Sequence, residues 1–256
     1  MSSKSSTRFN APDRASHLMS PDTPSAGPDC SREGKRITAD NAASLSGSDA
    51  VLFCDCGELA YRVEPEKGLL ELREQLGVYA NTRPVQFPSP QLAELSAYKA
   101  KVVEKLDIPC VRDLTVGVHY GRRQEGDSEG TAFDTTDYSR ASIVRLVRWA
   151  GRYALRFRPP KPVHSGDKHN VMATSRLWRR TVSAVFAREF PSLELDHVLV
   201  DTAATVLSSA PTMLNGVILT EDTFGDILSD QVAGIVPSPQ AMPCPRPSDG
   251  PSTPWG

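Results

Sequence analysis

Phe224-Gly225-Asp226-Ile227-Leu228-Ser229-Asp230 places two carboxylates four residues apart in the chain. If this stretch is helical, Asp226 and Asp230 lie on one face of the helix and can bind one cation together. Just beyond it, seven of the last twenty residues are prolines, so residues 237–256 are expected to form a disordered tail. The spacing therefore predicts a metal site next to the point where globular patterning ends.

Composition sets broad limits on the kind of protein. The chain has 256 residues and a formal net charge of −2, which suits one or two domains and gives no indication of nucleic acid or an anionic membrane as partner. No apolar run reaches the roughly 20 residues that a membrane span needs. Five scattered cysteines predict neither a disulfide framework nor a zinc site. A reducing compartment, the cytoplasm, is the expected location.

Patterns typical of strands and helices alternate through the middle of the chain. Residues 1–33 are rich in serine, proline and charge without periodicity, which predicts a disordered tail. Apolar runs typical of buried strands follow at 49–54, 198–200 and 217–219. Helical stripes lie at 68–76, 139–155 and 174–190, the last with Thr174 or Ser175 as its expected cap. This alternation predicts an α/β layered fold.

Several charged residues stand at the ends of these predicted elements. Three arginines in one cleft would suit a substrate with two carboxylates, because each guanidinium can bind a carboxylate through two parallel hydrogen bonds. A third carboxylate next to the helical pair would complete an oxygen-only site for Mg²⁺ or Mn²⁺. Taken singly, each candidate is better explained as an ordinary solvated surface charge. The candidates are Arg73, Arg83 and Arg112 for carboxylates, Asp201, Asp226 and Asp230 for metal, and Lys168 as a proton carrier.

Five motifs in a fixed order resemble those of a known family. They run from Glu64 to Pro84, Val111 to Thr115, Asp167 to Arg179, Val200 to Ala204 and Phe224 to Asp230. Together they resemble the isocitrate/isopropylmalate dehydrogenase family, and within it the 3-isopropylmalate dehydrogenases, with wording that looks fungal. The third motif, Asp167-Lys168-His169-Asn170-Val171, is similar to the family's "DKANV" element.

This resemblance implies an activity, a fold and a set of residue roles. Members oxidise a 2-hydroxy acid with NAD⁺ and release CO₂ while Mg²⁺ or Mn²⁺ stabilises the enolate. Both Lys168 and Asp201 are then expected to enter the neighbouring subunit's site, so a homodimer forms the active site, helped by an arm from Tyr120 to Tyr138. The implied roles are carboxylate binding by Arg73, Arg83 and Arg112, metal binding by Asp201, Asp226 and Asp230, proton uptake by Lys168, and contact with the isopropyl group and nicotinamide by Glu66, Leu69 and Leu70.

Two departures from the family pattern concern the chemistry. The family's catalytic tyrosine aligns with His119, and Tyr120 takes the place of the aromatic residue that follows it. Histidine can donate a proton near neutral pH, so His119 and Tyr120 are both candidates for the general acid. The second departure is Asp222, which stands where the family usually has an asparagine before the metal helix.

The resemblance also divides the chain into domains. The family's "GDGIGPE" opening is absent upstream of residue 34, and "GSLGLLPSA" and "HGSAPDIAGK" are absent after Val236. The large domain is therefore expected to be incomplete, truncated at both ends, with no NAD-binding residues identified. The expected segments are a tail at 1–33, part of the large domain at 34–84, the small dimerisation domain at 85–215, part of the large domain with the metal helix at 216–236, and a tail at 237–256.

Two classes of function follow from the sequence. The first is NAD-dependent oxidative decarboxylation of 3-isopropylmalate to 2-oxoisocaproate, in leucine biosynthesis or a secondary pathway. Related malates, namely isocitrate, homoisocitrate and tartrate, are rival substrates. The second class is a non-catalytic remnant or dimerising pseudoenzyme.

Overall fold

A computed structural model describes residues 45, 70, 72–87, 89–126 and 130–236 of the chain. The chain divides into two compact units, residues 1–76 with 255–256, and residues 77–254. In the first unit, residues 70 and 72–75 are helical and Leu72 is buried, in keeping with the helix expected there. The strand expected at 49–54 and the tails at 1–33 and 237–256 lie outside the described residues.

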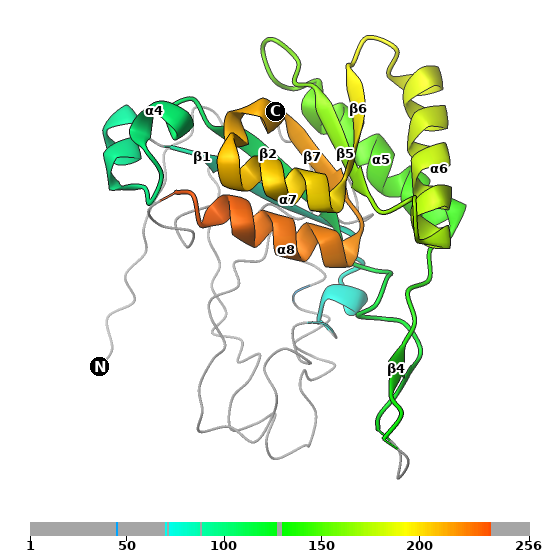
Figure 1. The fold of residues 1–256 in the computed structure, drawn as a ribbon. Helices are drawn as coiled ribbons and strands as arrows, with labels where there is room; N and C mark the ends of the chain where they lie inside the picture. Colours follow the sequence, from blue (N-terminus) through cyan, green and yellow to red (C-terminus); the bar gives the residue numbers. More distant parts are fainter. Residues whose placement is uncertain (1–44, 46–69, 71, 88, 127–129, 237–256) are drawn as a thin grey trace, which may run out of the picture. The chain divides into compact units, whose positions relative to one another are not determined.

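The second unit contains a five-stranded sheet with the strand order β1-β2-β7-β5-β6 (Figure 1). Strand β1 pairs antiparallel with β2, and the other neighbours pair parallel. The strands expected near 198–200 and 217–219 are confirmed as β6 and β7. The five strands are β1 (Ala80–Gln86), β2 (Asp107–Asp113), β5 (Val163–Asp167), β6 (Leu195–Leu199) and β7 (Val217–Thr220).

Helices cover both faces of this sheet, as a largely parallel sheet requires. On one face, α5 (Arg140–Ala154) and α6 (Ala173–Glu189) share a core with the strands that includes Val217 and Leu219. On the other face, α7 (Val200–Ser209) and α8 (Asp222–Ala233) share a second core that includes Ile218. Because side chains alternate along a strand, the split of neighbouring β7 residues between two cores confirms the layered α/β prediction.

The two long helices on the first face test where the sequence predicts each helix to begin. Helix α5 begins where expected, because the Ser139 hydroxyl accepts a hydrogen bond from the Ser142 backbone N–H at 3.1 Å. For α6 the expected cap is wrong: Met172 occupies the N-cap position and makes no side-chain cap bond. Thr174 and Ser175 lie inside the first turn, and Ser175 is buried.

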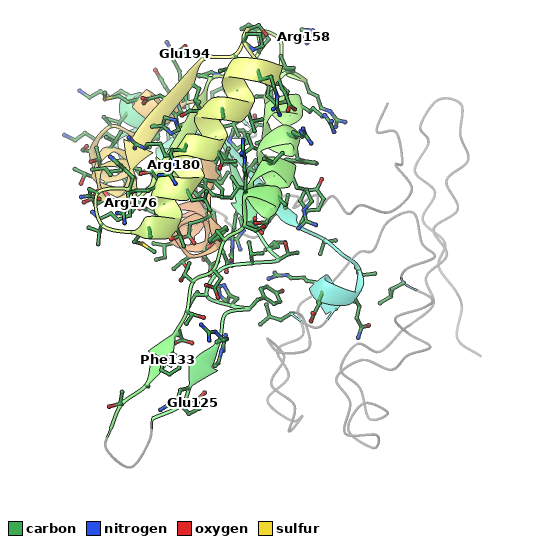
Figure 2. The ribbon with its side chains drawn as sticks, turned by 90° about the vertical axis from the view of Figure 1, so that its right-hand side faces the viewer. Glu125, Phe133, Arg158, Arg176, Arg180 and Glu194 are labelled. Atoms are coloured by element: carbon green, nitrogen blue, oxygen red, sulfur yellow. The ribbon has the colours of Figure 1, made fainter. Side chains whose placement is uncertain are left out.

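Shorter elements complete the described part. The strands β3 (Arg123–Gln124) and β4 (Phe133–Asp134) form an exposed two-stranded hairpin that extends away from the sheet (Figure 2). No helix among the described residues is long and apolar enough to cross a membrane. The predicted domain boundaries at 84 and 215 stay a prediction. The remaining pieces are η1 (Pro90–Leu95), α4 (Ala100–Val103) and η2 (Pro211–Leu214).

Candidate functional site

Helix α8 is held close to the sheet at its first turn. The Glu221 carboxylate caps it by accepting a hydrogen bond from the Phe224 N–H at 2.7 Å. Gly225 faces the sheet, where a Cβ would meet Thr220 Oγ1 and lie 2.7 Å from the Cβ of Arg112. Only glycine permits this approach, so the motif's glycine brings the predicted metal helix against strand β2.

Two of the predicted arginines lie on the sheet face that α8 covers. Asn81 of β1 is the partner of Arg112 on β2, and Arg83 follows Asn81 by two residues, so both arginine side chains leave the same face. Arg83 forms an ion pair with Asp230, and Arg112 forms one with Asp226. The structure therefore brings together four of the residues selected from the sequence.

The two aspartates of this cluster remain accessible. Their side chains are 42% exposed for Asp226 and 68% exposed for Asp230, one helical turn apart on α8. Carboxylate oxygens on one helix face fit the preference of Mg²⁺ and Mn²⁺ for oxygen ligands. Two of the ligand positions of a divalent cation can thus be supplied by this helix.

The third predicted metal ligand lies elsewhere in the chain. Strand β6 ends at Leu199, so Asp201 falls in the first turn of α7 rather than on the strand. Its carboxylate accepts a hydrogen bond from the Lys168 ammonium at 2.5 Å, which lowers the pKa of Asp201. Within the residues that the structure describes, no group of three or more histidine, cysteine, aspartate or glutamate side chains is placed to hold a metal. One chain therefore supplies Asp226 and Asp230 as a pair and Asp201 as a separate residue.

Arg112 also binds the carboxylate of Asp222, which stands where the family usually has an asparagine. Its Nε and Nη2 atoms donate to one oxygen of Asp222 at 3.1 and 2.9 Å. The other oxygen of Asp222 contacts Nδ1 of His119. The Asp222 side chain is only 2% exposed. A buried carboxylate thus links a predicted substrate-binding arginine to a predicted acid.

Buried acidic groups surround the start of α8. Burial raises the pKa of Asp113 to about 6, although the Thr115 N–H bond and Arg145 oppose this shift, and it raises the pKa of Glu221 as well. The Tyr138 hydroxyl accepts from the Asp222 N–H at 2.9 Å and donates to Glu221 at 3.3 Å. Burial also raises the pKa of this hydroxyl, which keeps Tyr138 neutral.

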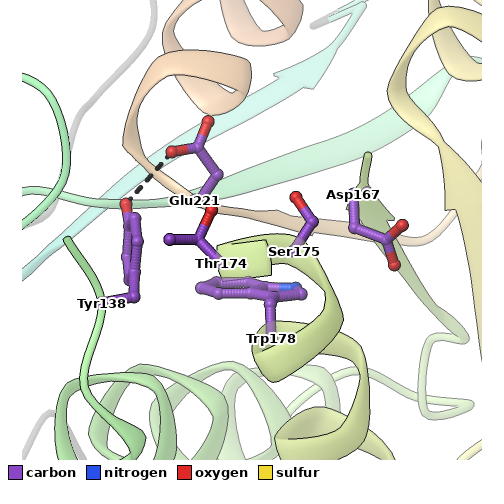
Figure 3. A pocket seen from close by; sticks show the side chains of 7 residues that line it. Tyr138, Asp167, Thr174, Ser175, Trp178 and Glu221 are labelled. Atoms are coloured by element: carbon purple, nitrogen blue, oxygen red, sulfur yellow. Dashed lines mark hydrogen bonds between the residues drawn. The ribbon is translucent and has the colours of Figure 1, made fainter. Parts of the chain in front are cut away.

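A small depression opens beside this cluster, lined by residues of α6, by the last two residues of β5, by Glu221 after β7 and by Tyr138 before α5 (Figure 3). Asp167 on its rim is buried and accepts from Arg179 Nε at 2.6 Å and from the His169 backbone N–H at 3.0 Å. Asp167 was not among the predicted site residues, because strand β5 (Val-His-Ser-Gly-Asp) carries no apolar pattern that would mark its end in the sequence. The lining residues are Tyr138, Gly166, Asp167, Thr174, Ser175, Trp178 and Glu221.

The other predicted site residues have simpler outcomes. Arg73 and Leu70 belong to the first compact unit, where both are partly buried. Tyr120 is partly buried in the second unit. Glu66 and Leu69 lie outside the described residues.

Comparison with known proteins identifies the family. The model of the isocitrate/isopropylmalate dehydrogenase family matches residues 12–244, and the chain belongs to this family. It is 47% identical over 205 residues to the 3-isopropylmalate dehydrogenase of Neurospora crassa, covering 78% of this chain and 55% of that protein. Against the 3-isopropylmalate dehydrogenase of Zymoseptoria tritici the identity is 46% over 207 residues, covering 80% and 56%. The resemblance stated from the motifs is confirmed.

Solved structures agree with the fold. An isocitrate dehydrogenase from Methylococcus capsulatus matches with a TM-score of 0.64 and 27% identity, over 82% of this chain and 60% of that chain. A β-decarboxylating dehydrogenase from Thermococcus kodakarensis matches with a TM-score of 0.65 and 28% identity, over 88% and 62%. The chain spans about half the length of the curated relatives it matches.

Proposed function

We propose that this protein carries out the NAD-dependent oxidative decarboxylation of 3-isopropylmalate to 2-oxoisocaproate, in leucine biosynthesis or a dedicated secondary pathway. The observation that carries the proposal is the cluster of Arg83, Arg112, Asp226 and Asp230, formed on a chain 46–47% identical to two 3-isopropylmalate dehydrogenases. The names of these relatives favour 3-isopropylmalate over isocitrate, homoisocitrate and tartrate. A cytoplasmic location belongs to the same proposal.

The arginines would bind the substrate's carboxylates. Both are paired with aspartates in the structure, and both aspartates are exposed enough to exchange partners. Asp226 and Asp230 would hold the cation, and Arg83 and Arg112 would then have guanidinium donors left for the substrate. When bound, Mg²⁺ or Mn²⁺ would supply Lewis acidity and NAD⁺ would supply a hydride acceptor.

The remaining steps move protons at named atoms of this chain. Lys168 Nζ would accept the proton of the substrate hydroxyl, and His119 or Tyr120 would return a proton to the product carbon. Arg73 is the proposed third carboxylate ligand. Glu66, Leu69 and Leu70 are proposed to contact the isopropyl group and the nicotinamide.

We propose a homodimer because one chain separates the residues that the chemistry needs together. Lys168 and Asp201 contact each other but form no cluster with Asp226 and Asp230 in the part of the chain described. Lys168 and Asp201 of the partner subunit would complete the site. The hairpin of β3 and β4, with its exposed Phe133, would contribute to the dimer contact.

The direct test measures NADH formation by the purified chain with 3-isopropylmalate, NAD⁺ and Mg²⁺. We expect NADH and CO₂ in equal amounts, loss of the reaction with a chelator, and a lower kcat/KM for isocitrate, homoisocitrate and tartrate. A higher kcat/KM for one of these rivals would make that rival, and not 3-isopropylmalate, the preferred substrate. A dimer that forms no NADH would favour the alternative function, a non-catalytic dimerising protein.

A mixing experiment tests the shared site. Lys168→Ala and Asp230→Asn subunits are each expected to be inactive as homodimers. Since random exchange produces half mixed dimers with one intact site each, a mixture is expected to regain about one quarter of the wild-type activity. Failure to regain activity, with subunit exchange shown by mass spectrometry, would contradict a site built from two subunits.

A further inference from the structure

His119 and Asp222 are 103 residues apart in sequence and meet in the fold. His119 lies in the segment after β2, and Asp222 is the first residue of α8. The contact joins Nδ1 of the imidazole to Oδ2 of the carboxylate. Both residues were noted in the sequence as departures from the family pattern.

The Asp222 side chain and backbone are held in place by residues other than His119. Arg112 donates two hydrogen bonds to Oδ1, and the Asp222 backbone N–H donates to the Tyr138 hydroxyl. The guanidinium charge offsets the burial of the carboxylate, and it leaves Oδ2 as the atom that faces the ring. An ionised carboxylate only accepts hydrogen bonds, so the ring nitrogen that faces it must carry a proton.

The histidine backbone is held from the other side. Arg123 Nη2 donates to the His119 carbonyl at 2.9 Å and to the Val118 carbonyl at 3.1 Å. The imidazole is partly exposed, whereas its carboxylate partner is buried. With Nδ1 directed at Asp222, Nε2 is the nitrogen that is left to exchange a proton with a ligand.

We infer that His119 and Asp222 form an acid dyad, in which Asp222 is a positioning residue and His119 Nε2 donates the proton to the product. This inference rests on the proposed function, and it selects His119 over Tyr120 as the acid. The donor is the imidazolium form of the ring, with a proton on each nitrogen: the Nε2–H bond breaks with its electron pair kept by nitrogen, the enolate's carbon–carbon π pair forms the new C–H bond, and the ring is left neutral with its proton on Nδ1. The ring then regains a proton from water. The charged and titratable groups around the pair are Arg112, Asp113, Arg123, Tyr138 and Glu221.

The Asp222→Asn variant separates this role from a general structural one. Arg112 needs an acceptor, so the asparagine Oδ1 is expected to keep the two guanidinium bonds. Its NH₂ group then faces His119, which makes Nδ1 an acceptor and moves the proton of the neutral ring to Nε2. The same substitution therefore reverses the tautomer without removing the contact.

The measurement is the ¹⁵N NMR signal of the histidine rings in the whole chain, at a pH where the imidazoles are neutral. His119→Gln assigns the signal, and His197→Gln, which removes a ring bonded to Ser183, is the matched control. We expect the Nδ1–H tautomer in the wild type and in the control, and the Nε2–H tautomer in Asp222→Asn. An Nε2–H tautomer in the wild type, or no change in the variant, would overturn the dyad.

Kinetics test the acid role separately, because the NMR result needs neither NAD⁺ nor metal. Loss of general acid catalysis costs about 10²–10⁴-fold in rate, so kcat is expected to fall in Asp222→Asn with little change in KM. An unchanged kcat with a reversed tautomer would overturn the acid role of His119. If the wild type formed no NADH, the proposed function and the acid role would fail together, while the tautomer would still decide the pairing.

Discussion

Arg112 is the residue that connects the site to the fold. Its side chain is nearly buried, yet it touches Asp222 on its inner side and Asp226 on its exposed side. The inner pair holds the start of α8 against β2, while the outer pair presents a carboxylate to solvent. The Arg112 guanidinium thus keeps its structural bond to Asp222, whereas a cation can replace it as the partner of Asp226.

Asp113 makes stability depend on pH at this same point. Its pKa rises from the ordinary 3.8 to about 6, chiefly because the carboxyl is buried. The folded protein therefore binds this proton more tightly than the unfolded chain, and the free energy of unfolding falls as pH rises through that interval. Asp113→Asn should remove this dependence and stabilise the neutral-pH protein by up to about 3 kcal/mol. Urea unfolding between pH 4 and 7 measures it.

The amide keeps an oxygen for the Thr115 N–H, which Asp113 Oδ1 accepts at 3.0 Å. Asp134→Asn, on the exposed hairpin, controls for the change in net charge. An Asp113→Asn protein that loses stability as steeply as the wild type over this pH interval would show that another group is responsible.

At the scale of elements, the closeness of α8 to β2 determines whether the arginine–aspartate cluster forms. Gly225→Ala adds a Cβ that collides with Thr220 and with Arg112, so the helix must move outward. We expect a loss of about 1–3 kcal/mol in the free energy of unfolding, typical of overpacking, together with weaker substrate binding. Chemical denaturation and calorimetry measure the two effects.

Gly234→Ala is the matched control at the other end of the same helix. Its Cβ would find contacts of 3.5 Å, and its φ of −65° suits alanine. Stability there should stay level or rise by a few tenths of a kcal/mol. Equal losses in the two variants would argue against the close approach at Gly225.

The packing of α6 on β5 depends on one buried polar pair. The Trp178 indole N–H donates to Ser165 Oγ at 3.1 Å, and its ring lies edge-on to Tyr138 at 6.0 Å. Ser165→Ala should cost about 1–3 kcal/mol because the indole N–H loses its partner in the core. In a Trp178→Phe background the same change should cost much less. A double-mutant cycle by thermal unfolding measures the difference, and equal costs in both backgrounds would contradict the bond.

At the scale of the whole molecule, the features that can be predicted from the sequence are those that depend on the spacing of residues close together in the chain. The period of Asp226 and Asp230 predicts a helix face, and Ser139 followed by a helical stripe predicts α5; the structure has both. The predicted cap of α6 is misplaced, because Thr174 and Ser175 lie inside its first turn and tertiary packing buries Ser175. The layered fold follows from alternation, whereas strand order requires contacts between distant segments.

The candidate site, too, could be predicted from the sequence only in part. The resemblance predicts Arg83, Arg112, Asp226 and Asp230 individually, and the fold brings these four together. Contact between His119 and Asp222 was not predictable from spacing, since 103 residues separate them. Asp201 stays with Lys168, which is consistent with a site completed by a second subunit but needs the mixing experiment.

The most direct test of the central claim is calorimetric titration of 3-isopropylmalate into the whole chain, with and without Mg²⁺. The account predicts binding that requires Mg²⁺ and weakens at least about tenfold, or about 1.4 kcal/mol, in Asp230→Asn, whose exposed side chain makes folding damage small. Equal binding without Mg²⁺, or an unchanged affinity in Asp230→Asn, would contradict a substrate site built from these arginines and aspartates.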